Sequence, residues 1–266
     1  MKVVIFMTLW QRRWSTVWWS LGAAALILLN MVFYPTFKDQ AAELEESLAA
    51  MPEAAIQLFG GSTDFFSPVG FLNSQIFFMM LPMILAILAI GIGASLIGRE
   101  EQNQTLEILL ARPISRSKLL IAKAIAGISV VSIVTLISLV IIIATARAVD
   151  IDVSARSIIL ATFMCWLFTL ASAAIAFVLA ASGKGRGLAI ALAAAVALTG
   201  YVVSSLSQTV DWLKIPAKFL PFHYYRPEAI LKTGNVEVSH VGILLAAIIV
   251  LGAISWLVFR GRDIKS

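Results

Sequence analysis

The stretch Gly98-Arg-Glu-Glu-Gln-Asn-Gln-Thr-Leu-Glu-Ile-Leu-Leu-Ala-Arg-Pro-Ile-Ser-Arg-Ser-Lys118 is a charged, helix-capable island between two long apolar runs. Its centre, Thr105-Leu-Glu-Ile-Leu-Leu110, has the spacing of an amphipathic helix, and Pro113 then interrupts the segment. A connecting turn requires only a few polar residues. We therefore expect a short cytoplasmic element between two membrane spans, on which something docks.

The composition is that of an integral membrane protein. Apolar residues make up 60% of the chain and charged residues 13%, and the mean hydropathy is +0.94, whereas a soluble domain is about one quarter charged. A membrane-spanning helix needs about 20 mostly apolar residues. Six segments qualify, at about 16–34, 75–97, 123–146, 157–181, 187–207 and 241–259. The sequence thus predicts an all-α polytopic protein, with one transmembrane domain over 1–266.

The basic residues indicate the orientation of these spans. With both termini in the cytoplasm, the inside holds 13 of the 20 basic residues, namely Lys2, Arg12, Arg13, Arg99, Arg112, Arg116, Lys118, Lys123, Lys184, Arg186, Arg260, Arg262 and Lys265. Cytoplasmic loops carry such an excess of Lys and Arg. We expect a multi-pass protein of the plasma (inner) membrane, in contact with lipid. The pI of about 9.5 then reflects orientation, and we expect no binding of nucleic acid.

The N-terminal apolar run follows basic residues, as in a signal peptide, but it is long and lacks a small-residue cleavage site. We expect a retained first span, preceded by a short helix from Val3 to Trp10 that lies along the inner membrane surface. Arg12 and Arg13 would then face lipid phosphates.

Two segments are expected outside. In the loop at 35–74, the spacing of apolar residues predicts an amphipathic helix from Lys38 to Met51, and a second short helix begins at Pro52 and ends at Gly60-Gly61; a solvated acidic loop is the alternative. The segment at 208–240 is rich in proline and aromatic residues. We expect it to form a cap at headgroup depth, with Trp212, Phe219, Phe222, Tyr224 and Tyr225 in the interface and a helical turn from Pro227 to Lys232 ended by Gly234.

Two spans contain residues that affect the shape or the packing of a helix. The second span contains Pro82, Gly91 and Gly93, which favour a kink or a thin region of the helix. In the fifth span, two stripes repeat small residues at four-residue steps; they are Gly187, Ala191 and Ala195, and Ala189, Ala193 and Ala197. Such stripes serve packing within the subunit or a dimer interface, and we favour packing within the subunit.

No charged residue occurs in the interior of a span, which argues against a proton- or ion-coupled carrier. Backbone carbonyls of broken helices leave that class open. There is no His-Glu-x-x-His motif, and Ser182-Gly-Lys-Gly185 lacks the other residues of a phosphate-binding loop. We therefore expect no catalytic, metal-binding or cofactor-binding residues, and any ATP would be bound by another chain.

One polar face stands out on the fourth span. Thr162, Cys165, Thr169 and Ser172 follow at i, i+3, i+7 and i+10, on one narrow side of a helix. They are candidates to line a translocation pathway. Hydrogen bonding between or within helices is the simpler interpretation, and Cys165 alone would be a small core residue.

Glu101, then Thr105-Leu-Glu-Ile-Leu-Leu-Ala-Arg-Pro-Ile-Ser-Arg116, and Lys123 resemble the permeases of type-2 ATP-binding-cassette (ABC) transporters, over nearly the whole chain. Family members usually read Gly-Thr-Leu-Glu, and Gln104 stands at the glycine position. The resemblance implies a coupling helix at 98–122 that seats in a cleft of a separate cytoplasmic ATPase subunit. Its contact residues would be Glu101, Thr105, Leu106, Glu107, Leu109, Leu110, Arg112, Pro113 and Arg116.

The resemblance further implies a permease homodimer whose ATPase partners bind ATP and Mg²⁺ and drive export. Apolar spans with few hydroxyls suit a hydrophobic or amphipathic substrate such as an antibiotic, peptide or lipid, although related permeases also resemble ion-extrusion subunits. The alternative is an ATP-independent carrier, channel or assembly factor. A membrane enzyme is a more distant third, because the sequence offers no convincing nucleophile, metal set or acid–base pair.

Overall fold

A computed structural model describes residues 1–39, 51–60, 65, 67–104 and 115–262. This part of the chain is helical and contains no strand. The helices in order are α1 (Lys2–Val32), α2 (Tyr34–Asp39), α4 (Glu53–Leu58), α5 (Pro68–Phe71), the π-helix η1 (Leu72–Phe78), α6 (Met80–Gln102), α8 (Arg116–Ala148), α9 (Ala155–Ala181), α10 (Arg186–Leu206), η2 (Asp211–Leu213), α11 (Lys214–Ala217), η3 (Pro221–Tyr224), α12 (Pro227–Thr233) and α13 (Val238–Gly261).

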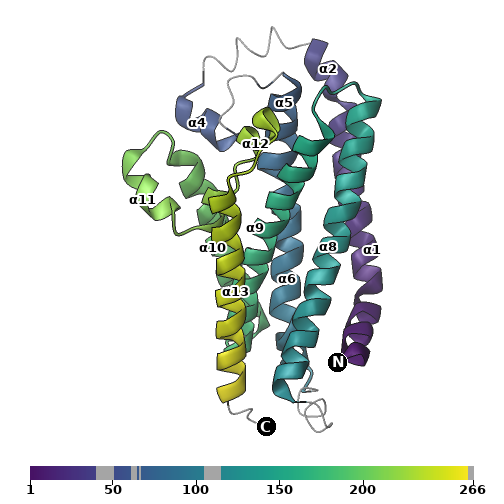
Figure 1. Cartoon of the computed structure of the whole chain (residues 1–266), viewed down its shortest axis with the longest axis vertical. Helices are drawn as coiled ribbons and strands as arrows, with labels where there is room; N and C mark the ends of the chain where they lie inside the picture. Colours follow the sequence, from purple (N-terminus) through teal and green to yellow (C-terminus); the bar gives the residue numbers. More distant parts are fainter. Residues whose placement is uncertain (40–50, 61–64, 66, 105–114, 263–266) are drawn as a thin grey trace.

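Six helical stretches are long and apolar enough to cross a membrane, and they contain the six predicted spans, apart from one residue at the end of the fifth. They run side by side as a bundle (Figure 1). Both ends of the chain lie at one end of this bundle, together with the ends of α6 and α8. We call this the terminal end; the short helices α2, α4, α5 and α12 lie at the opposite end.

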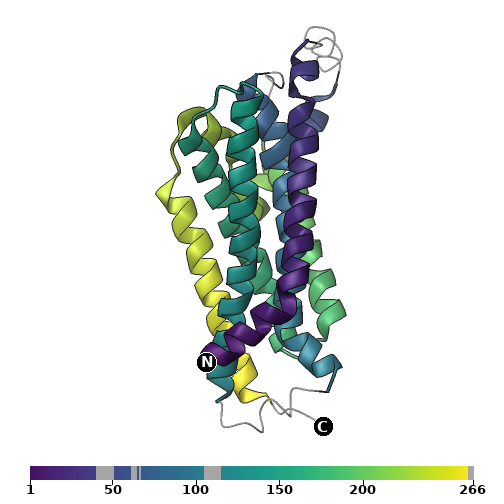
Figure 2. The ribbon, with the colours of Figure 1, turned by 90° about the vertical axis from the view of Figure 1, so that its right-hand side faces the viewer.

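The helix predicted from Val3 to Trp10 is present as the first part of α1. It does not end before the span, because α1 is one helix of 31 residues. Figure 2 shows that its N-terminal part is oblique to the rest, which runs along the bundle. The Arg13 guanidinium lies 4.1 Å from the ring centroid of Trp10, a cation–π contact typical of the membrane surface.

Side-chain caps explain where several helices begin. Ser115 accepts a hydrogen bond from the backbone N–H of Lys118 at the start of α8, and Ser154 accepts one from that of Ser157 at the start of α9. These bonds satisfy donors that the first turn of a helix leaves without partners. At the opposite end of the molecule, Gly234 ends α12 in the left-handed conformation, as predicted.

The second span is irregular, at a different place from the one expected. Its break lies at Met79, between η1 and α6, and α6 is continuous across Gly91 and Gly93. Pro82 lies in the first turn of α6. A backbone N–H in the first turn has no acceptor within the helix, so the proline removes no helical hydrogen bond there. The helices α6 and α9 approach closely at Gly93, where a Cβ atom would overlap the backbone of Ala173 on α9.

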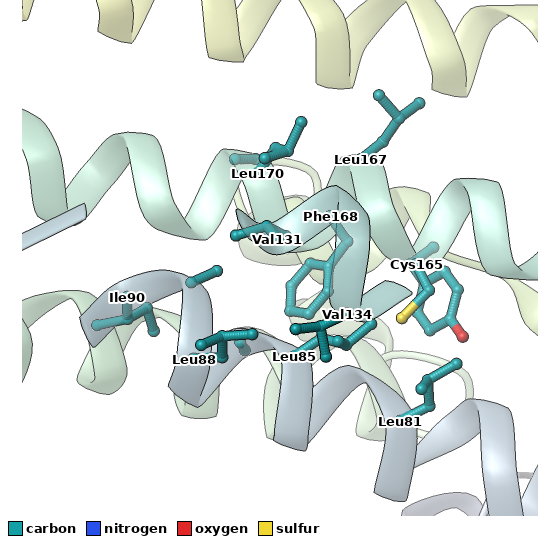
Figure 3. Close-up of a cluster of buried hydrophobic side chains, with 14 of the residues drawn as sticks. Leu81, Leu85, Leu88, Ile90, Val131, Val134, Cys165, Leu167, Phe168 and Leu170 are labelled. Carbon is teal, nitrogen blue, oxygen red and sulfur yellow. The ribbon is translucent and has the colours of Figure 1, made fainter. Parts of the chain in front are cut away.

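The core is centred on α9, which contacts α6, α8, α10, α12 and α13. Figure 3 shows Cys165 and Phe168 of α9 among Leu81 and Leu85 of α6 and Val134 of α8. In α10, the stripe of Ala189 and Ala193 is buried in the bundle, in agreement with the favoured interpretation. The other stripe, Gly187, Ala191 and Ala195, is exposed in the single chain.

At the opposite end, the aromatic cap is only partly as expected. Trp212 and Phe219 are exposed, but Phe222 and Tyr225 are buried within the protein. They pack on Phe168, with ring centroids 5.4 and 6.0 Å away, because the prolines turn the segment back over the bundle.

In the outer loop, the second short helix is present as α4. It follows Pro52 and ends before Gly60, which has a φ of +113°. The amphipathic helix predicted from Lys38 to Met51 falls mostly on 40–50, outside the described residues.

Candidate functional site

Arg262, just after α13, contacts the ends of three other helices. Its Nη1 atom lies 2.5 Å from Oε1 of Glu101 on α6 and donates a hydrogen bond of 3.4 Å to the carbonyl oxygen of Ala181 on α9. The carbonyl oxygen of Arg262 accepts a hydrogen bond of 2.7 Å from Nη1 of Arg116, the first residue of α8. We call these four residues the Arg262 junction. Through it, the helix ends that flank 105–114 are joined to each other.

The turn after α9 is shaped to receive this guanidinium. Gly183 has a φ of +80°, and a Cβ atom there would overlap the Arg262 side chain. The last carbonyls of a helix carry partial negative charge, which attracts a cation. The side chains of Arg262 and Glu101 are 27% and 19% exposed, so water screens their attraction less than that of a pair on an open surface.

A second ion pair lies beside the junction. Nζ of Lys123 on α8 is 2.6 Å from Oε1 of Glu100 on α6, and the two side chains are 8% and 18% exposed. Nη2 of Arg12 on α1 donates a hydrogen bond of 2.6 Å to Oγ of Ser95 on α6. Contacts between charged or polar groups thus connect α1, α6, α8, α9 and α13 at the terminal end.

Of the predicted coupling residues, the structure describes two. Glu101 and Arg116 lie at the ends of α6 and α8, and both belong to the Arg262 junction. The other seven, Thr105, Leu106, Glu107, Leu109, Leu110, Arg112 and Pro113, lie outside the described residues. Their role therefore stays a prediction.

Gln104 has a backbone φ of +54°, in the left-handed region. Glycine adopts this conformation most readily, and glycine is the residue that the family pattern usually has here. The turn after α6 is thus made with Gln104, whose N–H donates a hydrogen bond of 3.0 Å to the carbonyl oxygen of Glu101.

The polar face of α9 is buried in the single chain. Thr162, Cys165, Thr169 and Ser172 are each at most 2% exposed. The hydroxyl groups of Thr162 and Ser172 donate to the carbonyl oxygens of Ile158 and Phe168, four residues earlier in the same helix. The hydrogen-bonding interpretation thus accounts for these groups within the helix itself, and the lining role stays a prediction.

A polar cavity of about 390 Å³ lies at the opposite end, and its lining includes Ser204, His223, Arg226 and Glu228. Burial lowers the pKa of His223, and the positive charge of Arg226 lowers it further. Its imidazole is therefore neutral at neutral pH. The ring packs edge-on against Tyr224, with ring centroids 5.2 Å apart.

From the sequence, Arg262 contributed only to the prediction of membrane orientation. Its contacts with the ends of three other helices were not predicted. The available signal was the pair of acids, Glu100 and Glu101, directly after the second span. Acids are rare on the predicted inner side, while basic residues end or begin several spans there. Which base each acid meets depends on how the helices pack.

A comparison with known families finds a match over nearly the whole chain. Residues 9–264 match the family described as ABC-2 family transporter protein. The chain belongs to this family. No curated protein sequence matches it. An ABC-2 permease is a membrane subunit that works with an ATPase subunit, and it spans the membrane several times.

In this ABC-2 permease, the substitution Arg262→Gln is expected to destabilise the folded chain. Glu101 would keep its charge at a site 19% exposed without its cation, and an unsatisfied group of this kind costs about 1–3 kcal/mol. Thermal unfolding of the purified chain in detergent measures the loss as a lower Tm. The exchange Glu101→Arg with Arg262→Glu should recover part of it.

The control is Lys184→Gln, which removes an exposed cation at the same end. We expect its effect to stay within about 0.5 kcal/mol. A Tm of Arg262→Gln equal to that of Lys184→Gln would contradict a stabilising role for the junction.

Proposed function

We propose that this chain is the permease subunit of an ATP-driven exporter, which moves a hydrophobic or amphipathic substrate out across the membrane with energy from a separate ATPase. The observation that carries the proposal is the Arg262 junction. It ties together the two helix ends that flank 105–114. A force applied to that segment would therefore act on α6, α8, α9 and α13 as a group.

The length of α8 supports the same proposal. A helix of 33 residues is about 50 Å long, whereas the hydrocarbon core is about 30 Å thick. One or both ends of α8 therefore extend beyond the core. With the termini in the cytoplasm of a plasma-membrane protein, the segment at 105–114 would be presented to a cytoplasmic ATPase, which would bind the ATP and Mg²⁺.

Transport would require the packing of α6 on α9 to change. The predicted lining residues on α9 are buried, and α6 packs closely on α9 where Gly93 meets Ala173. A substrate could therefore reach Thr169 or Ser172 only if α9 separates from the helices that pack around it.

We also propose a homodimer of permeases. The exposed stripe of Gly187, Ala191 and Ala195 on α10 supports this proposal, because small residues allow the backbones of two helices to approach. The buried stripe is already used within the chain.

The proposed function is tested by using the chain as bait. It is captured from its native membranes in mild detergent, and the eluate is assayed for ATP hydrolysis. We expect a stoichiometric ATPase that co-elutes with the chain and is retained on gel filtration. An eluate without ATPase activity would overturn the exporter proposal in favour of an ATP-independent carrier, channel or assembly factor.

A further inference from the structure

An apolar cavity of about 450 Å³ lies between α8 and α13, with α6 and α9 behind it. In Figure 2, α13 (yellow) diverges from α8 (teal) away from the terminal end. The two helices meet near that end, where Nε1 of Trp256 donates a hydrogen bond of 2.8 Å to Oγ of Ser117. The cavity is therefore a groove that narrows toward the terminal end; we call it the α8–α13 groove.

Small residues hollow out this groove. Gly252 and Ala253 on α13, and Gly127 on α8, line it together with larger apolar side chains such as Ile121 and Ile125. The volume lies in the range of ligand-binding pockets. Ile121 and Ile125 are 46% and 38% exposed, so the groove is open along the side that faces the bilayer.

The extent of the groove matches one leaflet. Its lining on α8 runs from Leu120 to Val131, a helical distance of about 16 Å. Half of the hydrocarbon core is about 15 Å thick. The groove thus has the length and polarity of an acyl chain that enters from the leaflet at the terminal end.

Two cations stand where a lipid headgroup would lie. Lys118 precedes Ile121 by three residues on α8, and Arg260 follows Trp256 by four residues on α13, so each lies on the groove side of its helix. The Arg260 guanidinium is 5.4 Å from the ring centroid of Trp256. Both cations are exposed, and neither forms an ion pair with an acid in the described part of the chain.

From these observations we propose that the α8–α13 groove binds an anionic phospholipid of the surrounding leaflet, with an acyl chain between the helices and the phosphate against Lys118 and Arg260. An apolar slot alone would accept any acyl chain. The cations select negative charge, because each basic residue near a membrane surface contributes about 1 kcal/mol toward an anionic lipid. The proposal is independent of the ATPase partner and holds for a permease or an ATP-independent carrier.

The test uses the full chain in phosphatidylcholine nanodiscs with a small fraction of phosphatidylglycerol that carries a photoactivatable group near the end of its acyl chain. Labelled peptides are located by mass spectrometry after illumination. We expect adducts on 120–131 and 248–256, about thirtyfold more than with the same label on phosphatidylcholine, because two cations act together.

Two variants separate the groove from general lipid contact. A Cβ atom at Gly252 or at Gly242 meets no other atom within 4 Å, so a side chain can start at either position without a clash at Cβ. Gly252→Leu fills the groove and should lower labelling at least fivefold, whereas Gly242→Leu, on the same helix outside the groove, should not. Ala253→Leu provides a second groove-filling variant if Gly252→Leu does not fold.

The cations are tested in the same way. Lys118→Gln with Arg260→Gln should reduce phosphatidylglycerol labelling to the level of phosphatidylcholine. Lys2→Gln with Lys184→Gln removes the same charge from exposed positions and should leave labelling unchanged. Lys2 lies next to the N-terminus, and Lys184 follows Gly183, which contacts Arg262 at the same end.

Three results would overturn the proposal. These are equal labelling by the two lipids, labelling that survives both groove-filling variants, and crosslinks between two copies of the chain in place of lipid adducts. The last result would show that a second copy fills the groove. None of them bears on whether an ATPase co-elutes with the chain, so the two proposals fail separately.

Discussion

Gly93→Ala is expected to destabilise the bundle more than a glycine-to-alanine substitution at any other glycine of α6. The new Cβ would overlap the backbone carbonyl of Ala173 on α9, and a backbone atom cannot move aside as a flexible side chain does. Overpacking of this kind costs about 1–3 kcal/mol, and Gly93→Val should cost more. The expected result is a lower Tm in detergent, with aggregation on gel filtration for Gly93→Val.

Gly91→Ala is the matched control. It lies two residues earlier in the same helix, and a Cβ there meets no atom within 4 Å. Both substitutions gain the same helix propensity, about 1 kcal/mol, so their difference reports the contact with α9. Equal stability of the two variants would show that α6 and α9 do not pack as closely as described.

Leu109→Asp is expected to abolish substrate-stimulated ATP hydrolysis by the complex while the chain still inserts into the membrane. The segment predicted to dock on the ATPase contains Leu106, Leu109 and Leu110, which would form an apolar contact ridge. A carboxylate in an apolar contact would be buried without a partner, which costs several kcal/mol, and each 1.4 kcal/mol lowers affinity tenfold. Co-elution of the ATPase and its turnover with and without substrate are measured together.

Gln102→Asp is the control for charge. It introduces the same carboxylate at an exposed position at the end of α6, before the ridge, and should retain coupling. Membrane fractionation of Leu109→Asp checks insertion. Normal coupling in this variant would mean that the segment does not dock through Leu109, even if the chain is an exporter subunit.

The predicted helices agree well with the structure, whereas the interpretation of several individual residues changed. Phe222 and Tyr225 resemble surface aromatics in the sequence, yet they are buried, because the chain folds back onto Phe168. The hydroxyl of Tyr225 donates a hydrogen bond of 2.6 Å to the carbonyl oxygen of Phe77 in the π-helix. Burial raises the pKa of this hydroxyl well above its usual value, so it stays a donor. Neither a π-helical turn nor its distant partner has a local sequence signal.

The sequence predicted where the Arg262 junction lies along the spans, but it did not predict which residues contact each other there. The charged island at 98–118 marks the terminal end in any sequence of this kind, since charges are too costly to leave in the bilayer. Glu101 and Arg116 were therefore identified correctly as residues at that end. Their link through Arg262, about 150 residues further along the chain, depends on where α13 finishes relative to α6 and α8.

What the sequence by itself determined is the number of spans, their approximate limits and the placement of both termini at one end, because these follow from apolar length and from the cost of burying charge. Only the tertiary structure decided which face of α9 is buried, which stripe of α10 is free and where the α8–α13 groove opens. The physical reason is that lipid and protein interior are equally apolar, so a membrane helix carries no hydropathy difference between the side that packs and the side that faces lipid.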